Sequence, residues 1–239
     1  MKFGIIAAGE GSRLSSEGLR TAKPLVEVCG EPLIDRLIRI FSENGASEIV
    51  VICNDLTNQV SSHLSELTEK GLHGKPIPLR YVVKSTPSSM HSFWELSRLF
   101  DDEPFVVTTV DTIFDETEFS KYVSAFADGC SERDGLMGVT SYVDDEKPLY
   151  VKTDDDMRIT GFLDKNDGEC NFISAGIYGL TSRSLETLNR CVERGESRMR
   201  NFQRALIADG LNLKAHAFSK VIDIDHVSDI EKAEKMISK

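Results

Sequence analysis

The chain has 239 residues, enough for one large α/β domain that buries well over half of the surface its unfolded form exposes. Hydrophobic residues make up 40% and charged residues 28%, which is ordinary for soluble globular proteins and argues against a disordered or fibrous chain. The formal net charge of -11 repels nucleic acid and anionic membranes, so we expect neither as a partner. A polyanionic small ligand therefore requires a local group of cations or a metal ion.

The N-terminal segment and the cysteines bear on the cellular environment. Residues 1–14 contain only a short apolar run, too short for a signal peptide or a membrane span, so we expect a cytoplasmic protein. The five cysteines show no C-x-x-C spacing and no pairing with histidine, which argues against a zinc site and a disulfide framework. We expect reduced structural thiols.

Strands and helices alternate in the first half of the chain, which is typical of a mostly parallel sheet covered by helices. The first strand is predicted over residues 3–7, and an amphipathic helix with apolar residues on one face over 33–41. Further along we predict a strand at 48–53, a helix at 57–70, a strand at 79–83, a helix at 89–100 and a strand at 104–109.

After residue 116 the pattern changes to short strands that follow one another, predicted at 135–141, 149–153, 158–163 and 172–180. Strands without intervening helices indicate a mixed or antiparallel extension, which we expect to bind a second substrate. Helices near 182–194 and 197–208, strands at 213–217 and 221–224 and a last helix from about 227 complete the chain. No repeat or linker divides it, so residues 1–239 are predicted to form a single α/β domain.

The first strand is followed directly by a glycine-rich loop, A-A-G-E-G-S-R-L over residues 7–14. The two glycines let the backbone turn sharply and bring N–H groups against phosphate oxygens, and Arg13 adds a cation shaped for phosphate. The dinucleotide fingerprint would need glycine in place of Leu14, and a Walker loop would need G-K-[ST], which is missing. A tight turn carrying a surface arginine is the plainer interpretation of this loop alone.

A second motif, T-A-K-P-L-V-E-V-C-G-E-P-L-I, covers residues 21–34. Pro24 makes the local chain extended, so Lys23 is expected on a stiff loop. Together the two motifs resemble the nucleotidyltransferase family that makes NDP-sugars, whose signature is approximately A-A-G-x-G-x-R-[LM] followed by K-P-x-x-x-V-x-G-x-P-[LM]-[IL]. Two linked motifs in order are far more specific than either alone.

The resemblance implies a Rossmann-like three-layer sandwich with a mostly parallel central sheet and an acceptor-side extension. It also implies an enzyme that moves the nucleoside monophosphate of an NTP to a small phosphorylated acceptor. The loop residues Ala8, Gly9, Glu10, Gly11, Ser12 and Arg13 would then bind the triphosphate. Arg13 and Lys23 would be the catalytic cations, with Lys23 neutralising charge where the acceptor phosphate attacks the α-phosphorus.

Two aspartates are the expected ligands of Mg²⁺. Asp111 ends an apolar strand, where open α/β sheets place ligands, although Val110 stands where the family usually has glycine. Asp223 aligns with the aspartate that joins the metal site in the family. Strand alternation puts Asp225 on the same face as Asp223, so its participation stays open. Each aspartate has a plainer interpretation as a turn residue or helix N-cap.

Residues 81–94 occupy the place where the family usually has Q-x-x-P-x-G-T-A. Lys84 stands in place of a base-reading glutamine, and Ser89 in place of glycine. A lysine donates hydrogen bonds but cannot accept them, which favours a base edge rich in acceptors and so tilts the prediction towards CTP. A solvent-facing Lys84 is the plainer alternative. The segment also faintly resembles cytidylyltransferases for phosphocholine.

The acceptor pocket is predicted from two further segments. Asp164 and Lys165 stand where the family has E-K-P, and Ala175 and Gly176 belong to a segment similar to [NS]-A-G-[IV]-Y. The preferred function is transfer to a sugar 1-phosphate with release of pyrophosphate. Alternatives are a cytidylyltransferase for phosphocholine or another phospho-alcohol, and a catalytically silent nucleotide-binding regulatory protein. The oligomeric state stays open, a homo-oligomer included.

Overall fold

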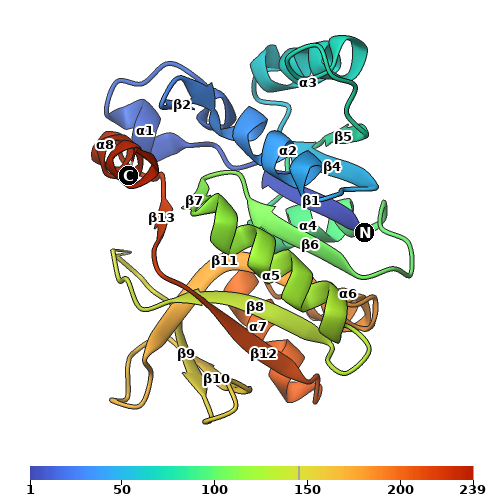
Figure 1. Ribbon diagram of the computed structural model, residues 1–239, viewed down its shortest axis with the longest axis vertical. Helices are drawn as coiled ribbons and strands as arrows, with labels where there is room; N and C mark the ends of the chain where they lie inside the picture. Colours follow the sequence, from blue (N-terminus) through green and yellow to red (C-terminus); the bar gives the residue numbers. More distant parts are fainter. Residues whose placement is uncertain (145, 239) are drawn as a thin grey trace.

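The computed structural model describes residues 1–144 and 146–238 and has a nine-stranded main sheet (Figure 1). Its strands are β1 (Lys2–Ala7), β4 (Glu48–Cys53), β5 (Leu79–Val83), β6 (Phe105–Thr109), β8 (Gly135–Thr140), β9 (Tyr150–Thr153), β10 (Ile159–Leu163), β11 (Phe172–Leu180) and β12 (Leu213–Phe218). Two small sheets pair β2 (Glu27–Val28) with β3 (Glu31–Pro32) and β7 (Thr112–Phe114) with β13 (Val221–Asp223). The strands predicted at residues 48–53, 79–83 and 172–180 begin and end where the sequence indicated.

The helices are α1 (Ser12–Ser16), α2 (Leu33–Glu43), α3 (Asn58–Lys70), α4 (Ser89–Ser97), α5 (Glu116–Gly129), α6 (Arg183–Glu193), α7 (Met199–Ala208) and α8 (Val227–Ile237), with a 3₁₀ turn η1 (Lys23–Leu25). Across the described parts of the chain, no helix has both the length and the apolar composition needed to cross a membrane.

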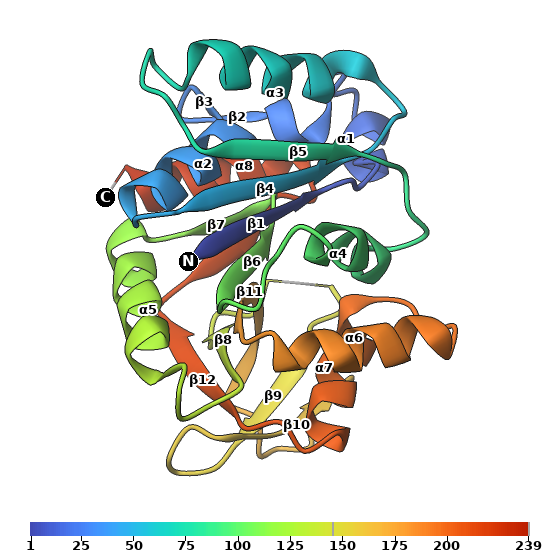
Figure 2. The same cartoon turned by 90° about the vertical axis from the view of Figure 1, so that its right-hand side faces the viewer.

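The four strands β6, β1, β4 and β5 run parallel in this order, with β5 at the edge of the sheet. Successive side chains of a strand face opposite sides, so Phe3 and Ile5 belong to one core and Ile6 to the other. Helices α2, α3, α5 and α8 cover the first core, and α4, α6 and α7 cover the second (Figure 2). The predicted α/β fold with three layers is confirmed.

The other half of the sheet is the predicted extension. Strand β11 pairs antiparallel with β6, β8 and β9, and β9 continues antiparallel to β10. Strand β12 returns parallel to β8. In Figure 1 these strands form the lower half of the molecule, below the parallel strands.

In the part of the chain that the structure describes, the strands β8, β9, β10 and β11 follow one another without an intervening helix, as expected, but helix α5, which lies between residue 116 and the first of them, was not predicted. Asp115 caps the N-terminus of this helix, because its side chain accepts the Glu118 N–H, and acidic residues occupy the first turn. Its buried residues Phe119, Tyr122 and Phe126 recur at helical spacing. That pattern was present in the sequence and could have identified the helix.

Phe119 tests the importance of this helix because its ring contacts those of Phe3, Phe41, Phe114 and Tyr122. Replacing it with alanine leaves a cavity among them, so Phe119→Ala should lower the free energy of unfolding by about 3–5 kcal/mol. Urea denaturation followed by circular dichroism measures the change.

The matched control is Lys121→Ala on the exposed side of the same helix, which should change stability by less than about 0.5 kcal/mol. Equal effects of the two substitutions would mean that α5 is not anchored through this aromatic cluster.

Candidate active site

A cavity of about 520 Å³ opens at the carboxyl ends of β1 and β6, where the loop after β1, the turn η1, the turn after β6 and the start of α4 meet. We call it the first cavity. Among its lining residues are the predicted loop residues Ala8, Gly9, Glu10, Gly11, Ser12 and Arg13, together with Lys23, Ser89, Asp111 and Asp225. The two N-terminal motifs therefore reach one site with Asp111 and Asp225, which lie far from them in the chain.

Gly11 is where the loop needs glycine. Its φ of 62° and ψ of 31° lie in the left-handed region, which side chains other than glycine adopt at a cost. A Cβ at this position would lie 2.9 Å from the Cβ of Lys23, closer than such atoms approach. The glycine thus lets the loop backbone pack directly against Lys23.

Lys23 lies between two carboxylates. Its Nζ is 2.5 Å from Asp111 Oδ2 and 2.9 Å from Asp225 Oδ1, and its side chain is only 10% exposed. Burial alone would lower the pKa of Lys23, but the attraction of Asp111 and then Asp225 is larger and raises it above its ordinary value. The lysine is therefore a permanent cation in the lining of the cavity.

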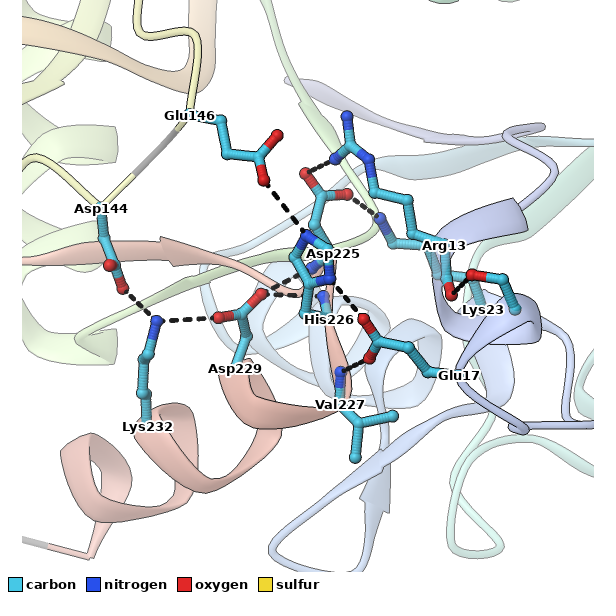
Figure 3. A network of polar contacts seen from close by, with 11 residues as sticks. Arg13, Glu17, Lys23, Asp144, Glu146, Asp225, His226, Val227, Asp229 and Lys232 are labelled. Atoms are coloured by element: carbon cyan, nitrogen blue, oxygen red, sulfur yellow. Dashed lines mark hydrogen bonds and ion pairs between the residues drawn. The ribbon is translucent and has the colours of Figure 1, made fainter.

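Arg13 shares Asp225 with Lys23: its Nη1 is 2.5 Å from Asp225 Oδ2 (Figure 3). Burial would raise the pKa of Asp225, but Lys23 and then Arg13 lower it, so this carboxylate is ionised. Asp225 is not the N-cap of α8, because His226 occupies that position. Instead, the side chain of Asp229 accepts the N–H groups of Asp225 and His226 at 3.2 and 2.8 Å, which orients the backbone that carries Asp225.

The two predicted metal ligands meet through the β7–β13 ribbon. Asp111 lies in the turn between β6 and β7, and its carbonyl accepts the Ile224 N–H at 3.0 Å. Asp223 stands opposite Thr112 in the same ribbon. Asp223 is exposed to solvent, but many protein atoms surround its carboxylate. This partial desolvation is the main cause that raises the pKa of Asp223, and repulsion from Asp111 and Asp225 adds to it. Access to solvent limits the size of that rise.

The donor set suits Mg²⁺. Asp111, Asp223 and Asp225 bring three carboxylates together against two cations, Lys23 and Arg13. Within residues 1–144 and 146–238, no group of three or more histidine, cysteine, aspartate or glutamate side chains could hold a metal ion. Mg²⁺ is commonly held by one or two carboxylates, its other ligands being water and substrate phosphates, so a pair such as Asp111 and Asp223 fits it.

A second cavity of about 230 Å³ adjoins the first, since Arg13 and Asp225 line both. Asp223 and Ala175 line it, the latter from β11. Gly176 lines neither cavity. It has φ 71° within an irregular stretch of β11, and a Cβ there would lie 3.2 Å from Thr112 Oγ1, so it allows β11 to approach the β6–β7 turn.

Ion pairs connect several residues that line the second cavity (Figure 3). Glu17, just after α1, accepts from His226 Nδ1 at 2.6 Å and from the Val227 N–H at 2.7 Å, and the first contact raises the pKa of His226. Lys232 of α8 contacts Asp144 at 2.8 Å. His226 and Val227 therefore connect the start of α8 to the residue that follows α1.

The structure divides the predicted acceptor residues between cavities. Asp164 and Lys165 line a third cavity of about 950 Å³, whereas Ala175 lines the second. Asp164 accepts from Arg200 Nη1 at 2.6 Å and Arg204 Nη2 at 2.8 Å. One substrate would have to extend across both cavities to contact all these residues.

The two residues predicted to read the base are also separated. Ser89 lines the first cavity, whereas Lys84 lies outside its lining and pairs with Glu95 at 2.9 Å, with half of its side chain exposed. The sequence prediction did not include Thr86, Ser88 and Ser92, which line the cavity beside Ser89. Ser88 accepts the His91 N–H as N-cap of α4, and a serine just before a helical pattern is a signal that could have identified it.

A comparison with protein-family models decides the family. The model described as nucleotidyl transferase matches residues 4–239. The chain belongs to this nucleotidyltransferase family.

Individual relatives agree with that membership. The nucleotidyltransferase is 30% identical to a mannose-1-phosphate guanyltransferase from Hypocrea jecorina over 186 residues, 74% of this chain and 49% of that protein. It is 26% identical to a glucose-1-phosphate cytidylyltransferase from Salmonella typhimurium over 133 residues, 48% of this chain and 52% of that protein. The chain thus spans about half the length of the curated relatives it matches.

The solved inositol-1-phosphate CTP transferase from T. maritima superposes with a TM-score of 0.79 at 19% identity, over 100% of this chain and 95% of that one. At this identity the likeness establishes the fold.

Gly11→Ala tests the packing of the loop in this nucleotidyltransferase. The new Cβ meets Lys23 and the backbone must hold an unfavourable φ, so nucleotide binding should weaken by at least about tenfold. Isothermal titration with each NTP in the presence of Mg²⁺ measures the loss.

Gly45→Ala is the matched control, because its φ of 74° imposes the same kind of strain but a Cβ there meets no atom within 4 Å. Both variants should lose about 1–2 kcal/mol of stability. Unchanged affinity in Gly11→Ala would remove the loop from the nucleotide site.

Proposed function

We propose that this protein transfers the nucleoside monophosphate of an NTP to a sugar 1-phosphate and releases pyrophosphate. The observation that carries the proposal is the position of Lys23, held between Asp111 and Asp225 beside the glycine-rich loop. Family membership and the sugar-1-phosphate relatives support the same reaction class.

The chain's own residues account for binding and alignment. The loop residues 8–13 present backbone N–H groups to the triphosphate, and Arg13 exchanges its contact with Asp225 for phosphate oxygens. An oxygen of the acceptor phosphate forms a bond to the α-phosphorus while the bond from that phosphorus to the bridging β-oxygen breaks, so pyrophosphate leaves. Because that attacking oxygen is already ionised near neutral pH, no side chain needs to remove a proton.

Lys23 and the two carboxylates have different electrostatic roles in this reaction. Lys23 neutralises the negative charge that gathers where the two phosphates meet, and Asp111 and Asp223 would hold Mg²⁺. When bound, Mg²⁺ would supply electrostatic stabilisation of the triphosphate. The cavity residues position the reactants, which is the main requirement of phosphoryl-type transfer.

The metal assignment predicts that Asp111→Asn and Asp223→Asn each lower turnover by about 100-fold or more while leaving the fold intact. An amide keeps the size of the side chain but removes the charge that binds the metal. Steady-state kinetics at several Mg²⁺ concentrations, with circular dichroism for folding, tests this.

Asp128→Asn on the exposed surface of α5 is the control and should keep full activity. Near-native turnover of either site variant at limiting Mg²⁺ would show that the metal is held elsewhere.

The reaction itself is tested by a pyrophosphate-release screen that crosses the common NTPs with sugar 1-phosphates, phosphocholine and other phospho-alcohols. We expect turnover with at least one sugar 1-phosphate. Turnover with phosphocholine alone would support the cytidylyltransferase alternative, and NTP binding without turnover of any pair would support a silent regulatory protein.

A further inference from the structure

The third cavity is basic in a protein whose net charge is -11. It lies between β9, β10 and α7 in the extension of the sheet. Five cationic residues and two acidic residues line it: Lys147, Lys165, Arg198, Arg200 and Arg204 against Glu146 and Asp164. A concave surface that gathers cations in an acidic protein favours an anionic ligand.

The ion pairs inside the third cavity do not neutralise all of its basic side chains. Asp164 is the shared partner of Arg200 and Arg204, so one carboxylate faces two guanidinium groups. Arg198 and Lys165 form no ion pair with any residue that the structure describes. These two side chains are available to a ligand.

The third cavity borders the reaction site. The Arg198 N–H donates to Ser88 Oγ at 3.4 Å, and Ser88 lines the first cavity. Glu146 lines both the second and third cavities, and its carboxylate lies 3.8 Å from His226 Nε2, next to Asp225 (Figure 3). A substrate whose phosphate lies near Lys23 can therefore extend towards Arg198.

The backbone at Arg198 is also unusual. Its φ of 72° and ψ of 137° belong to a region that residues other than glycine occupy only at a cost in free energy. Such strain is often found at ligand sites, where the surrounding structure maintains it. Here it accompanies an arginine that lines a cationic cavity.

The second cavity has the opposite balance of charge. The acidic residues that line it, Asp144, Glu146, Asp223, Asp225 and Asp229, outnumber the basic residues Arg13, His226 and Lys232. Lys232 is shared by Asp144 and Asp229, and His226 lies near Glu146. Of these two cavities, the third therefore suits an anionic group.

We propose that the acceptor carries a second anionic group, a carboxylate or a phosphate, in addition to the phosphate that attacks the NTP, and that Arg198 and Lys165 bind this group in the third cavity. The acceptor class would be phosphorylated sugar acids or sugar bisphosphates. The proposal rests on the proposed function and narrows its substrate.

The test compares matched acceptors: hexose 1-phosphates, the corresponding hexuronate 1-phosphates and the hexose 1,6-bisphosphates, with phosphocholine as the cationic compound. We expect kcat/KM for at least one doubly anionic acceptor to exceed that of its neutral counterpart by about tenfold or more. Whether the uronate or the bisphosphate is preferred distinguishes carboxylate from phosphate.

Arg198→Gln and Lys165→Gln should each remove most of this advantage by raising KM for the anionic acceptor, with KM for the NTP unchanged. Arg80→Gln is the matched control, since Arg80 lies on β5, is half exposed and, among the residues that the structure describes, has only Glu48, 4.0 Å away, as an ionic partner. Thermal denaturation verifies that every variant is folded.

Preference for a neutral sugar 1-phosphate or for phosphocholine would overturn the inference while leaving nucleotidyl transfer in place. An anionic preference that survives in both cavity variants would overturn it as well. If no acceptor is converted at all, the proposed function itself fails and this inference falls with it.

Discussion

The contact of one lysine with two carboxylates organises the candidate active site. Lys23 is on the turn after the glycine-rich loop, Asp111 is at the end of β6, and Asp225 lies just beyond β13, yet the ammonium group is within 2.9 Å of both carboxylates. Three distant segments must therefore fold together before the site exists. The β7–β13 ribbon makes this possible because the Ile224 N–H binds the carbonyl of Asp111 and fixes the spacing of the acidic residues.

The charges of the site are nearly but not fully balanced. Lys23 and Arg13 compensate two of the three carboxylates, and repulsion from Asp111 and Asp225 contributes to the raised pKa of Asp223. A triphosphate that attracts Arg13 and Lys23 would leave the carboxylates under-compensated, and a divalent cation restores the balance. Nucleotide and metal binding should therefore support one another.

Much of the fold followed from local patterns, because β4 is a continuous, buried apolar run and β5 is a mainly apolar run, each between clear turns. The glycine-rich loop and Lys23 were likewise identifiable, since their motifs are contiguous. Helix α5 was missed although its capping residue and apolar spacing were present. The partners of Asp225 and the separation of Asp164 from Ala175 depend on how distant segments pack, and no local pattern encodes that.

Thermal denaturation of Lys23→Met at increasing Mg²⁺ concentration, without nucleotide, tests the central electrostatic claim most directly. Removing the ammonium group leaves Asp111, Asp223 and Asp225 without their central cation, so the melting temperature should fall below that of the wild type. Added Mg²⁺ should bind the exposed carboxylates and restore stability in the variant much more than in the wild type. A variant as stable as the wild type, with no response to Mg²⁺, would contradict this account.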